Sequence, residues 1–344
     1  MRVMAVRQYG PPKVLEMQQA PDLQPKAGEV LIRVKAIGVN FADLLQRMGV
    51  YPGTPKPPFI PGLEIAGVVE KVAEGGKPGE GETFRAGDAV VALTQFNAYA
   101  EWAAVPAARV FRLPPGVPFD DAAAIPVNYL TAYHAMFTMG NMQPGDRILI
   151  HGAGGGVGIA AVQLAQVRGL VIFGTAGAAK HAYLRKIGVN HPIDSGISDF
   201  VETMRNYAPD GIEMVMDAIG GKSFARSYEC LGPTGRLVLY GFSAGAGTGV
   251  TRQPLASLKA TLQTPRFNPI DLMARNISVI GVRLTKLLSR PALLRSELGE
   301  IFRLYGEKKI KPVISKTFSL EHAAEAHQYI HDRKNIGKVV LTVK

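Results

Sequence analysis

Between residues 147 and 282, short apolar runs alternate with segments whose apolar positions recur at helical spacing. The clearest unit begins with the apolar run 147–150 and continues through a glycine cluster. It ends in a segment with one apolar stripe, formed by Val157, Ala161, Leu164 and Ala165. A strand-length run followed by helical periodicity is typical of a βα unit. Repetition of this unit predicts an α/β fold with a parallel, doubly wound sheet.

The same pattern assigns the other elements of this half. It predicts strands at 170–175, 191–194, 214–217, 237–240 and 278–281, and helices at 159–168, 179–187 and 198–207. Two further helices (291–305 and 320–331) and a closing strand (338–343) are predicted near the C-terminus.

The first hundred residues are predicted to be mostly β. Short strands are expected at 2–8, 29–39, 62–69, 87–91 and 98–105, a proline-rich loop at 51–61 and a polar hairpin loop at 74–83. A short helix-like run follows Asn40 and ends at Gly49. Residues 120–140 are predicted to be helical, with a break or kink at Pro126.

The glycine cluster has the spacing Ala153-x-Gly155-x-x-Gly158, so alanine replaces the first glycine of the dinucleotide-binding fingerprint. Glycines let the backbone approach a pyrophosphate, and the helix that follows offers free N–H groups. A tight turn that only packs a helix onto a sheet is the alternative. The strand before the cluster and the helix after it favour the cofactor interpretation.

Composition limits the class of protein. A chain of 344 residues, 47% hydrophobic and 19% charged, indicates a globular enzyme with two domains. It has no apolar stretch of membrane-spanning length and no signal-like N-terminus, and its single cysteine, Cys230, fits a cytoplasmic location. The net charge of +11 is scattered, which favours a solvated basic surface that helps to attract an anionic cofactor over a specific nucleic-acid site.

Motifs along the whole chain resemble those of one enzyme family. They include GVNFADL (38–44), PGLEIAGVV (61–69), VNYLTAYHAMF (127–137), HGAGGGVGIAAVQLA (151–165), VMDAIGG (215–221) and NIGKVVL (335–341). Together they resemble the zinc-free quinone oxidoreductase branch of the medium-chain dehydrogenase/reductase superfamily. NHPID (190–194) and FNPIDLMARNISVIGV (267–282) are most similar to its vesicle amine transport protein-like subgroup. The resemblance implies a GroES-like β-rich catalytic domain (1–123 and 286–344) and a Rossmann NADP(H)-binding domain (124–285).

The resemblance also predicts that no metal is bound. Asn40 and Leu63 stand where the zinc-dependent relatives carry a catalytic cysteine and a histidine, and only Glu64 is kept. Neither side chain can supply the thiolate or imidazole that a catalytic zinc needs. His327 and His331 have a zinc-compatible spacing on a predicted helix but lack further ligands, so we expect them on a solvated helix face.

The end of the predicted strand at 170–175, the second of the Rossmann part, bears on the choice between NAD(H) and NADP(H). It has no Asp or Glu to bind a ribose 2′-hydroxyl, and Lys180 follows it. In the resembling reductases, a glycine and a lysine (here Gly174 and Lys180) contact the 2′-phosphate, and a tyrosine that also contributes is replaced here by Ser195. The alternative for Lys180 is an exposed charge at a helix start. These observations favour NADP(H) over NAD(H).

The resemblance and the strand ends predict the rest of the site. Asn40 and Tyr51 are the candidate catalytic residues, as hydrogen-bond donors to a carbonyl. Asn40 could instead only cap the helix after it, and Tyr51 could only brace the proline loop. The remaining predicted cofactor contacts are Thr131, Gly155, Gly156, Val157, Gly158, Thr175, Gly241, Phe242, Ser243 and Lys338.

Two functions remain open from the sequence. The first is zinc-independent hydride transfer from NADPH to a quinone or α,β-unsaturated carbonyl, whose negative charge after hydride addition is delocalised. The second is an NADPH-binding protein that acts mainly through partners such as a membrane, a lipid or RNA. The resemblance also implies a homodimer, with strand 276–282 as the joining sheet edge.

Overall fold

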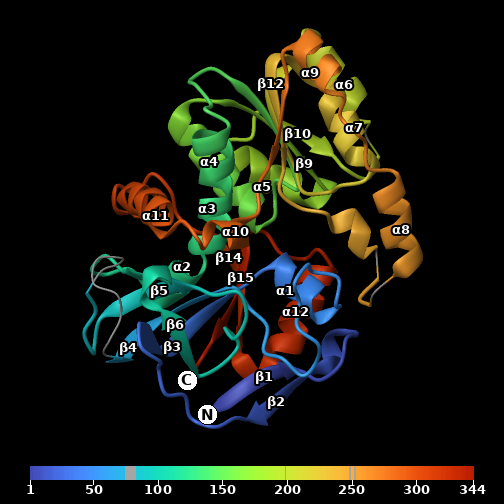
Figure 1. The fold of residues 1–344 in the computed structure, drawn as a ribbon. Coiled ribbons are helices and arrows are strands. Elements are labelled where there is room, and N and C mark those ends of the chain that lie inside the picture. Colours follow the sequence, from blue (N-terminus) through green and yellow to red (C-terminus); the bar gives the residue numbers. More distant parts are fainter. Residues whose placement is uncertain (74–82, 198, 248, 252) are drawn as a thin grey trace.

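The computed structural model describes residues 1–73, 83–197, 199–247, 249–251 and 253–344. The predicted polar loop at 74–83 lies almost entirely outside the described residues. Two sheets dominate the molecule, one in each half, and the chain ends return to the same half (Figure 1). The α/β fold with a GroES-like part and a Rossmann sheet is confirmed.

The Rossmann sheet has six parallel strands. Their spatial order is β10 (His191–Asp194), β9 (Val171–Ala176), β8 (Arg147–His151), β11 (Ile212–Asp217), β12 (Leu231–Leu239) and β13 (Ser278–Gly281). Numbered along the chain this order is 3-2-1-4-5-6, which reverses direction between β8 and β11. In such sheets, ligands bind at the carboxyl ends of the strands beside that reversal.

Helices cover both faces of this sheet (Figure 1). They are α4 (Gly156–Arg168), α5 (His181–Lys186), α6 (Phe200–Tyr207), α7 (Lys222–Glu229), α8 (Pro254–Leu262) and α9 (Pro269–Arg275). The first three were predicted within a few residues of these bounds. The sequence pattern missed α7, α8 and α9; α8 leaves most of its apolar side chains exposed, so it lacks the buried stripe that periodicity detects.

The second sheet is built mainly from N-terminal strands. Its order is β14 (Ile314–Ser319), β15 (Lys338–Thr342), β3 (Glu29–Val39), β4 (Glu64–Val72), β5 (Ala89–Leu93) and β7 (Val110–Arg112), and β6 (Trp102–Pro106) pairs with β3. A separate hairpin joins β1 (Arg2–Val6) to β2 (Leu15–Gln19); β2 was not predicted. The closing strand β15 places the C-terminal residues inside the N-terminal sheet, between β14 and β3.

Helices at the junction link the two halves. They are α2 (Phe119–Ala123), α3 (Pro126–Tyr133) with its π-helical extension (His134–Met139), α10 (Leu284–Leu287) and α11 (Pro291–Gly306). Pro126 occupies the first turn of α3, where a missing N–H costs nothing, so the predicted break falls there. One hydrophobic cluster runs from Ala36 and Val91 in the N-terminal sheet to Ile148 and Val238 in the Rossmann sheet.

Candidate active site

The glycine turn after β8 forms an open helix N-terminus. Gly155 is the N-cap of α4, and the N–H groups of Gly156, Val157 and Gly158 precede the first residue with an intrahelical acceptor. A Cβ on Gly158 would lie 2.3 Å from the carbonyl oxygen of Gly152, so no larger residue fits there without a shift. Gly155, Gly156 and Val157 are half-buried, and the N–H of Gly155 already donates to the carbonyl of Gly152 at 2.9 Å. This geometry fits a pyrophosphate.

The C-terminal return rests on this turn. The N–H of Gly337 donates to the carbonyl of Gly154 at 3.0 Å, and Gly155 and Gly337 form an isolated β-bridge. The Lys180 ammonium donates to the carbonyl of Asn335 at 2.5 Å. Burial, with a contribution from Arg333, lowers the pKa of Lys180. The glycine turn, Lys180 and the return therefore form one surface.

A cavity of about 270 Å³ lies at the carboxyl ends of the strands. Its walls include Ser195 just after β10, Thr175 in β9 and His151 at the end of β8. Ser195 is exposed, whereas Thr175 and His151 are buried. Gly174 lies beside Thr175; a Cβ on it would lie 2.8 Å from Cβ of Ala153, which explains the need for glycine. The volume and position fit the adenosine half of a dinucleotide.

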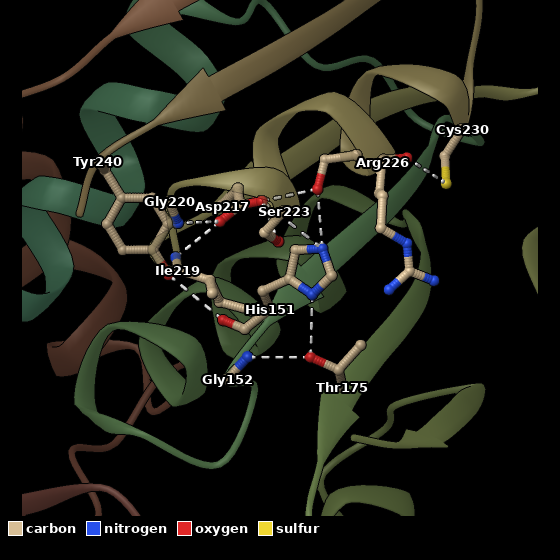
Figure 2. A network of polar contacts seen from close by, with 11 residues as sticks. His151, Gly152, Thr175, Asp217, Ile219, Gly220, Ser223, Arg226, Cys230 and Tyr240 are labelled. Carbon is tan, nitrogen blue, oxygen red and sulfur yellow. Dashed lines mark hydrogen bonds and ion pairs between the residues drawn. The ribbon is translucent and has the colours of Figure 1, made fainter. Parts of the chain in front are cut away.

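A buried carboxylate, Asp217, is hydrogen-bonded to residues that line this cavity (Figure 2). Asp217, at the end of β11, accepts from the N–H of Ile219 at 2.6 Å and of Gly220 at 3.3 Å. The hydroxyls of Ser223 and Ser227 each donate to its other oxygen at 2.7 Å. These bonds hold the start of α7 against the strand end. The sequence analysis did not single out this residue, although an aspartate that ends a buried strand is a recognisable signal.

The same hydrogen-bond network reaches β8 and β9, through His151 and Thr175 (Figure 2). His151 Nε2 lies 3.0 Å from Ser227 Oγ, and His151 Nδ1 lies 3.1 Å from Thr175 Oγ1. Thr175 Oγ1 also accepts from the N–H of Gly152 at 3.2 Å. Burial lowers the pKa of His151, so the ring is neutral at physiological pH. Thr175 is thus already bonded within the protein and shapes the cavity wall.

A second polar cluster lies where β3, β4 and β15 meet. The Lys338 ammonium donates to Asn40 Oδ1 at 2.6 Å and to Glu64 Oε1 at 2.5 Å, and Asn40 Nδ2 donates to Glu64 Oε1 at 2.9 Å. Glu64 Oε2 accepts from the N–H of Val127 at the start of α3. All three side chains are buried. The structure brings the predicted residues Asn40 and Lys338 together on Glu64; their pairing was not anticipated.

The other predicted residues lie around these two clusters. Tyr51 is half-buried, its hydroxyl 3.5 Å from Thr285 Oγ1, and the guanidinium of Arg283 lies over its ring. Thr131 is buried in α3. Gly241, Phe242 and Ser243 follow β12, and the N–H of Ser243 donates to the carbonyl of Ala218 after β11. Within the part of the chain that the structure describes, no hydrogen bond joins Tyr51 to Asn40.

The expectation of a solvated helix face for His327 and His331 is wrong. His327 is fully buried in α12 (Ala323–His331), and His331 is half-buried. Buried polar partners, namely Tyr99 for His327 and Arg47 for His331, draw the two rings inward. Among the described residues no cluster of three or more His, Cys, Asp or Glu side chains could hold a metal ion. Within the same residues, no helix is long and apolar enough to cross a bilayer.

Comparison with known proteins identifies the family. Residues 187–341 match the family model of zinc-binding dehydrogenases, and residues 26–115 match that of the alcohol dehydrogenase GroES-like domain. The chain is 39% identical over 320 residues to "Synaptic vesicle membrane protein VAT-1 homolog" of Danio rerio, with 93% of this chain and 65% of that protein covered. It is 38% identical to the Mus musculus protein of the same name (99% and 83% covered) and 30% identical to "Quinone oxidoreductase" of Rattus norvegicus (99% and 97%).

Solved structures of related proteins have the same overall fold. The human VAT-1 homolog-like protein has a TM-score of 0.85 at 34% identity, covering 100% of this chain and 98% of that one. The Escherichia coli quinone oxidoreductase complexed with NADPH has a TM-score of 0.87 at 28% identity, with both chains fully covered. The fold and site define an oxidoreductase with a GroES-like and a Rossmann part. The chain belongs to the medium-chain dehydrogenase/reductase superfamily, in the quinone oxidoreductase-like branch that includes the VAT-1 homologues.

Proposed function

We propose that this protein is a zinc-independent reductase that transfers hydride from NADPH to a quinone or an α,β-unsaturated carbonyl. The cluster of Asn40, Glu64 and Lys338 carries this proposal. Glu64 is the carboxylate kept from the zinc-binding pattern, and the Lys338 ammonium lies 2.5 Å from it. The charge of Glu64 is therefore compensated without a metal. The solved relative from Escherichia coli is described as complexed with NADPH, which supports this choice of cofactor.

The residues that would hold NADPH follow from the geometry. The N-terminus of α4, from Gly155 to Gly158, would bind the pyrophosphate. The cavity beside Ser195 would take the adenosine, and Lys180 would approach the 2′-phosphate by releasing the carbonyl of Asn335. Bound NADPH supplies the hydride and sets the position of its acceptor.

We propose that Tyr51 and Asn40 orient the acceptor. Tyr51 carries its hydroxyl on a half-exposed ring held by Arg283, so it is accessible to a carbonyl oxygen. Both N–H groups of Asn40 donate within the protein, to the carbonyl of Gly38 and to Glu64 Oε1, and its oxygen accepts from Lys338. Asn40 would therefore reach the acceptor by releasing one of these bonds. Because Glu64 balances the charge of Lys338, the Tyr51 hydroxyl is the group that would donate to the oxyanion that develops as hydride arrives.

Turnover tests the proposal. NADPH oxidation is followed with a panel of quinones and enals, and metal content is measured on the same sample. We expect oxidation above the buffer control, with less than stoichiometric zinc and no loss after chelation. Tyr51→Phe should lower kcat by about 10²-fold if the hydroxyl donates to the oxyanion. No oxidation with any member of the panel would refute the function.

A second candidate is binding to a lipid surface with little turnover. It is favoured by α8, which exposes Leu255 (83%), Leu258 (56%) and Leu262 (76%) at helical spacing. The relatives named as synaptic vesicle membrane proteins point the same way. Sedimentation with anionic vesicles tests it: a Leu255→Gln and Leu262→Gln variant should bind less, and Ile197→Gln, at another exposed apolar residue, should not change binding.

The predicted assembly, location and domain boundaries remain proposals. Among the described residues, β13 is the outermost strand of the Rossmann sheet and pairs only with β12, so its other edge could join a second copy. We propose a homodimer through this edge, a cytoplasmic location, and domain limits at residues 123/124 and 285/286. A monomeric mass in sedimentation equilibrium would refute the dimer.

A further inference from the structure

Three fully buried side chains from different parts of the chain form one hydrogen-bonded row. Asp43 lies in α1 (Phe41–Arg47), Tyr99 in the loop before β6, and His327 in α12. The Tyr99 hydroxyl donates to Asp43 Oδ2 at 3.1 Å and lies 3.0 Å from His327 Nε2. Hydroxyl, carboxyl and imidazole groups in contact can each both accept and release a proton.

Each end of this row is a buried atom without a partner. Asp43 Oδ1 and His327 Nδ1 have no hydrogen-bond partner among the described residues. A buried polar atom left without a partner destabilises the folded state, so two in one row call for an explanation. A proton path has such ends, because one atom must take up the proton and another must release it.

Different charged and titratable groups surround the two ends of the row. The Asn40 N–H donates to Asp43 Oδ2 at 2.9 Å, and the charges of Lys338 and Glu64 act on Asp43 from the active-site side. Arg47 and His331 are the charged and titratable groups that act on His327. His331 lies one helical turn beyond it, is half-buried, and contacts Arg47 Nη2 at 2.6 Å. The Asp43 end therefore lies beside the cluster of Asn40, Glu64 and Lys338, and the His327 end lies one helical turn from the half-buried His331.

The protonation states suit a path at neutral pH. Burial raises the pKa of Asp43 to about 7, so this carboxyl gains and loses a proton easily. Burial also raises the pKa of Tyr99 well above its ordinary value and lowers that of His327, so both are neutral carriers. Burial and Arg47 lower the pKa of His331 to about 4, so it is neutral as well.

We propose that Asp43, Tyr99 and His327 form a buried proton relay from the α12 surface to the cluster of Asn40, Glu64 and Lys338. As one proton leaves Asp43 Oδ1, the Tyr99 proton moves to Asp43 Oδ2 and the His327 Nε2 proton moves to the Tyr99 oxygen. His327 Nδ1 takes up one proton, which must reach this buried atom from solvent past the half-buried His331. One proton enters and one leaves, and no electrons move along the relay. Its use in reduction, to supply the proton that accompanies hydride, rests on the proposed function.

The path itself can be tested without cofactor or substrate. The carboxyl band of Asp43 is assigned by its loss in Asp43→Asn, and its relaxation after a pH jump is followed by infrared spectroscopy on the full chain. Tyr99→Phe keeps the ring and removes the link, so relaxation should slow by roughly 10²-fold. Tyr129→Phe is the matched control: this buried tyrosine donates to Gln163 outside the row, and its loss should leave the rate unchanged.

Two outcomes overturn the relay: an unchanged relaxation rate in Tyr99→Phe, or a carboxyl band that persists in Asp43→Asn. If Tyr99→Phe does not fold, His327→Gln must show the same slowing. In turnover, Tyr99→Phe should lower kcat with an unchanged KM for NADPH and raise the solvent isotope effect; an unchanged kcat would refute the role in reduction. A fast, Tyr99-dependent relaxation in a protein that reduces no acceptor would refute the proposed function alone.

Discussion

Removal of the Lys338 ammonium should destabilise the protein strongly. In Lys338→Met the side-chain length is kept and the charge is lost. Glu64 is fully buried. In the variant it would keep the hydrogen bonds from Asn40 at 2.9 Å and from the Val127 N–H at 2.7 Å. It would lose the Lys338 ammonium, the buried cation that lies 2.5 Å from its carboxylate. A buried ion pair broken on one side typically costs about 3–5 kcal/mol, because an uncompensated charge remains.

The loss of stability caused by breaking the buried ion pair can be separated from a general effect of removing a lysine. Lys334 is 61% exposed and pairs with Asp332 at 2.8 Å, so Lys334→Met should cost about 0–1 kcal/mol. For domains of 150–250 residues, 1 kcal/mol shifts Tm by roughly 2–4 °C. Lys338→Met should therefore lower Tm by roughly 6–20 °C. The double variant Lys338→Met with Glu64→Gln should recover most of the loss, because no buried charge remains.

Thermal unfolding followed by calorimetry measures the wild type, the three single variants (Lys338→Met, Lys334→Met and Glu64→Gln) and the double variant at one pH and salt concentration. Equal losses in Lys338→Met and Lys334→Met would refute the reasoning. So would a double variant that loses as much as the sum of its single variants, because the two side chains would then be energetically independent.

Three further outcomes are expected. Lys180→Ala should weaken NADPH binding about tenfold or more and leave NADH binding nearly unchanged, as measured by calorimetric titration; equal losses for both cofactors would contradict a contact with the 2′-phosphate. Gly158→Ala should abolish binding of both, because its Cβ would lie 2.3 Å from the Gly152 carbonyl; unaltered affinity would exclude the glycine turn as the pyrophosphate site. The folded pKa of Asp43, raised to about 7, lies above the unfolded value of 3.8, so its stabilising contribution is complete below that value and is lost as pH rises through 7. The stability difference between wild type and Asp43→Asn should therefore fall from pH 4 to 7 in denaturant titrations, and a constant difference would contradict the shift.

The sequence predicted the strands of the Rossmann sheet and the helices α4, α5 and α6, because these strands are short apolar runs and β8, β9 and β10 are each followed by a helix with buried residues. Residues 147–151 and 156–168 illustrate this: a strand that is almost fully buried precedes a helix whose inner positions are all apolar. Periodicity failed where burial does not alternate in this way. β2 has one buried residue in five, and α8 has one buried residue, Ala260, in nine.

The site was predictable only in part, because contacts between distant segments leave no local pattern. Gly155, Gly158 and Lys180 stand in a motif whose spacing carries the signal. The bond between Lys338 and Glu64 joins residues 274 positions apart, and each alone resembles an ordinary surface charge. His327 is a second example. Its neighbours in sequence predicted a solvated helix face, but its ring is buried and contacts the hydroxyl of Tyr99, which lies 228 positions away.

These buried polar residues share one physical consequence. Lys338, Glu64, Asp43 and His327 come from β15, β4, α1 and α12, and all four are buried, so bulk solvent does not reach them. The placement of each therefore depends on the correct assembly of the GroES-like part. Because β15 continues directly from the return that rests on the glycine turn, a cofactor bound at that turn would act on the same strand that carries Lys338. Binding of NADPH and the charge state of the buried cluster should therefore be coupled through β15.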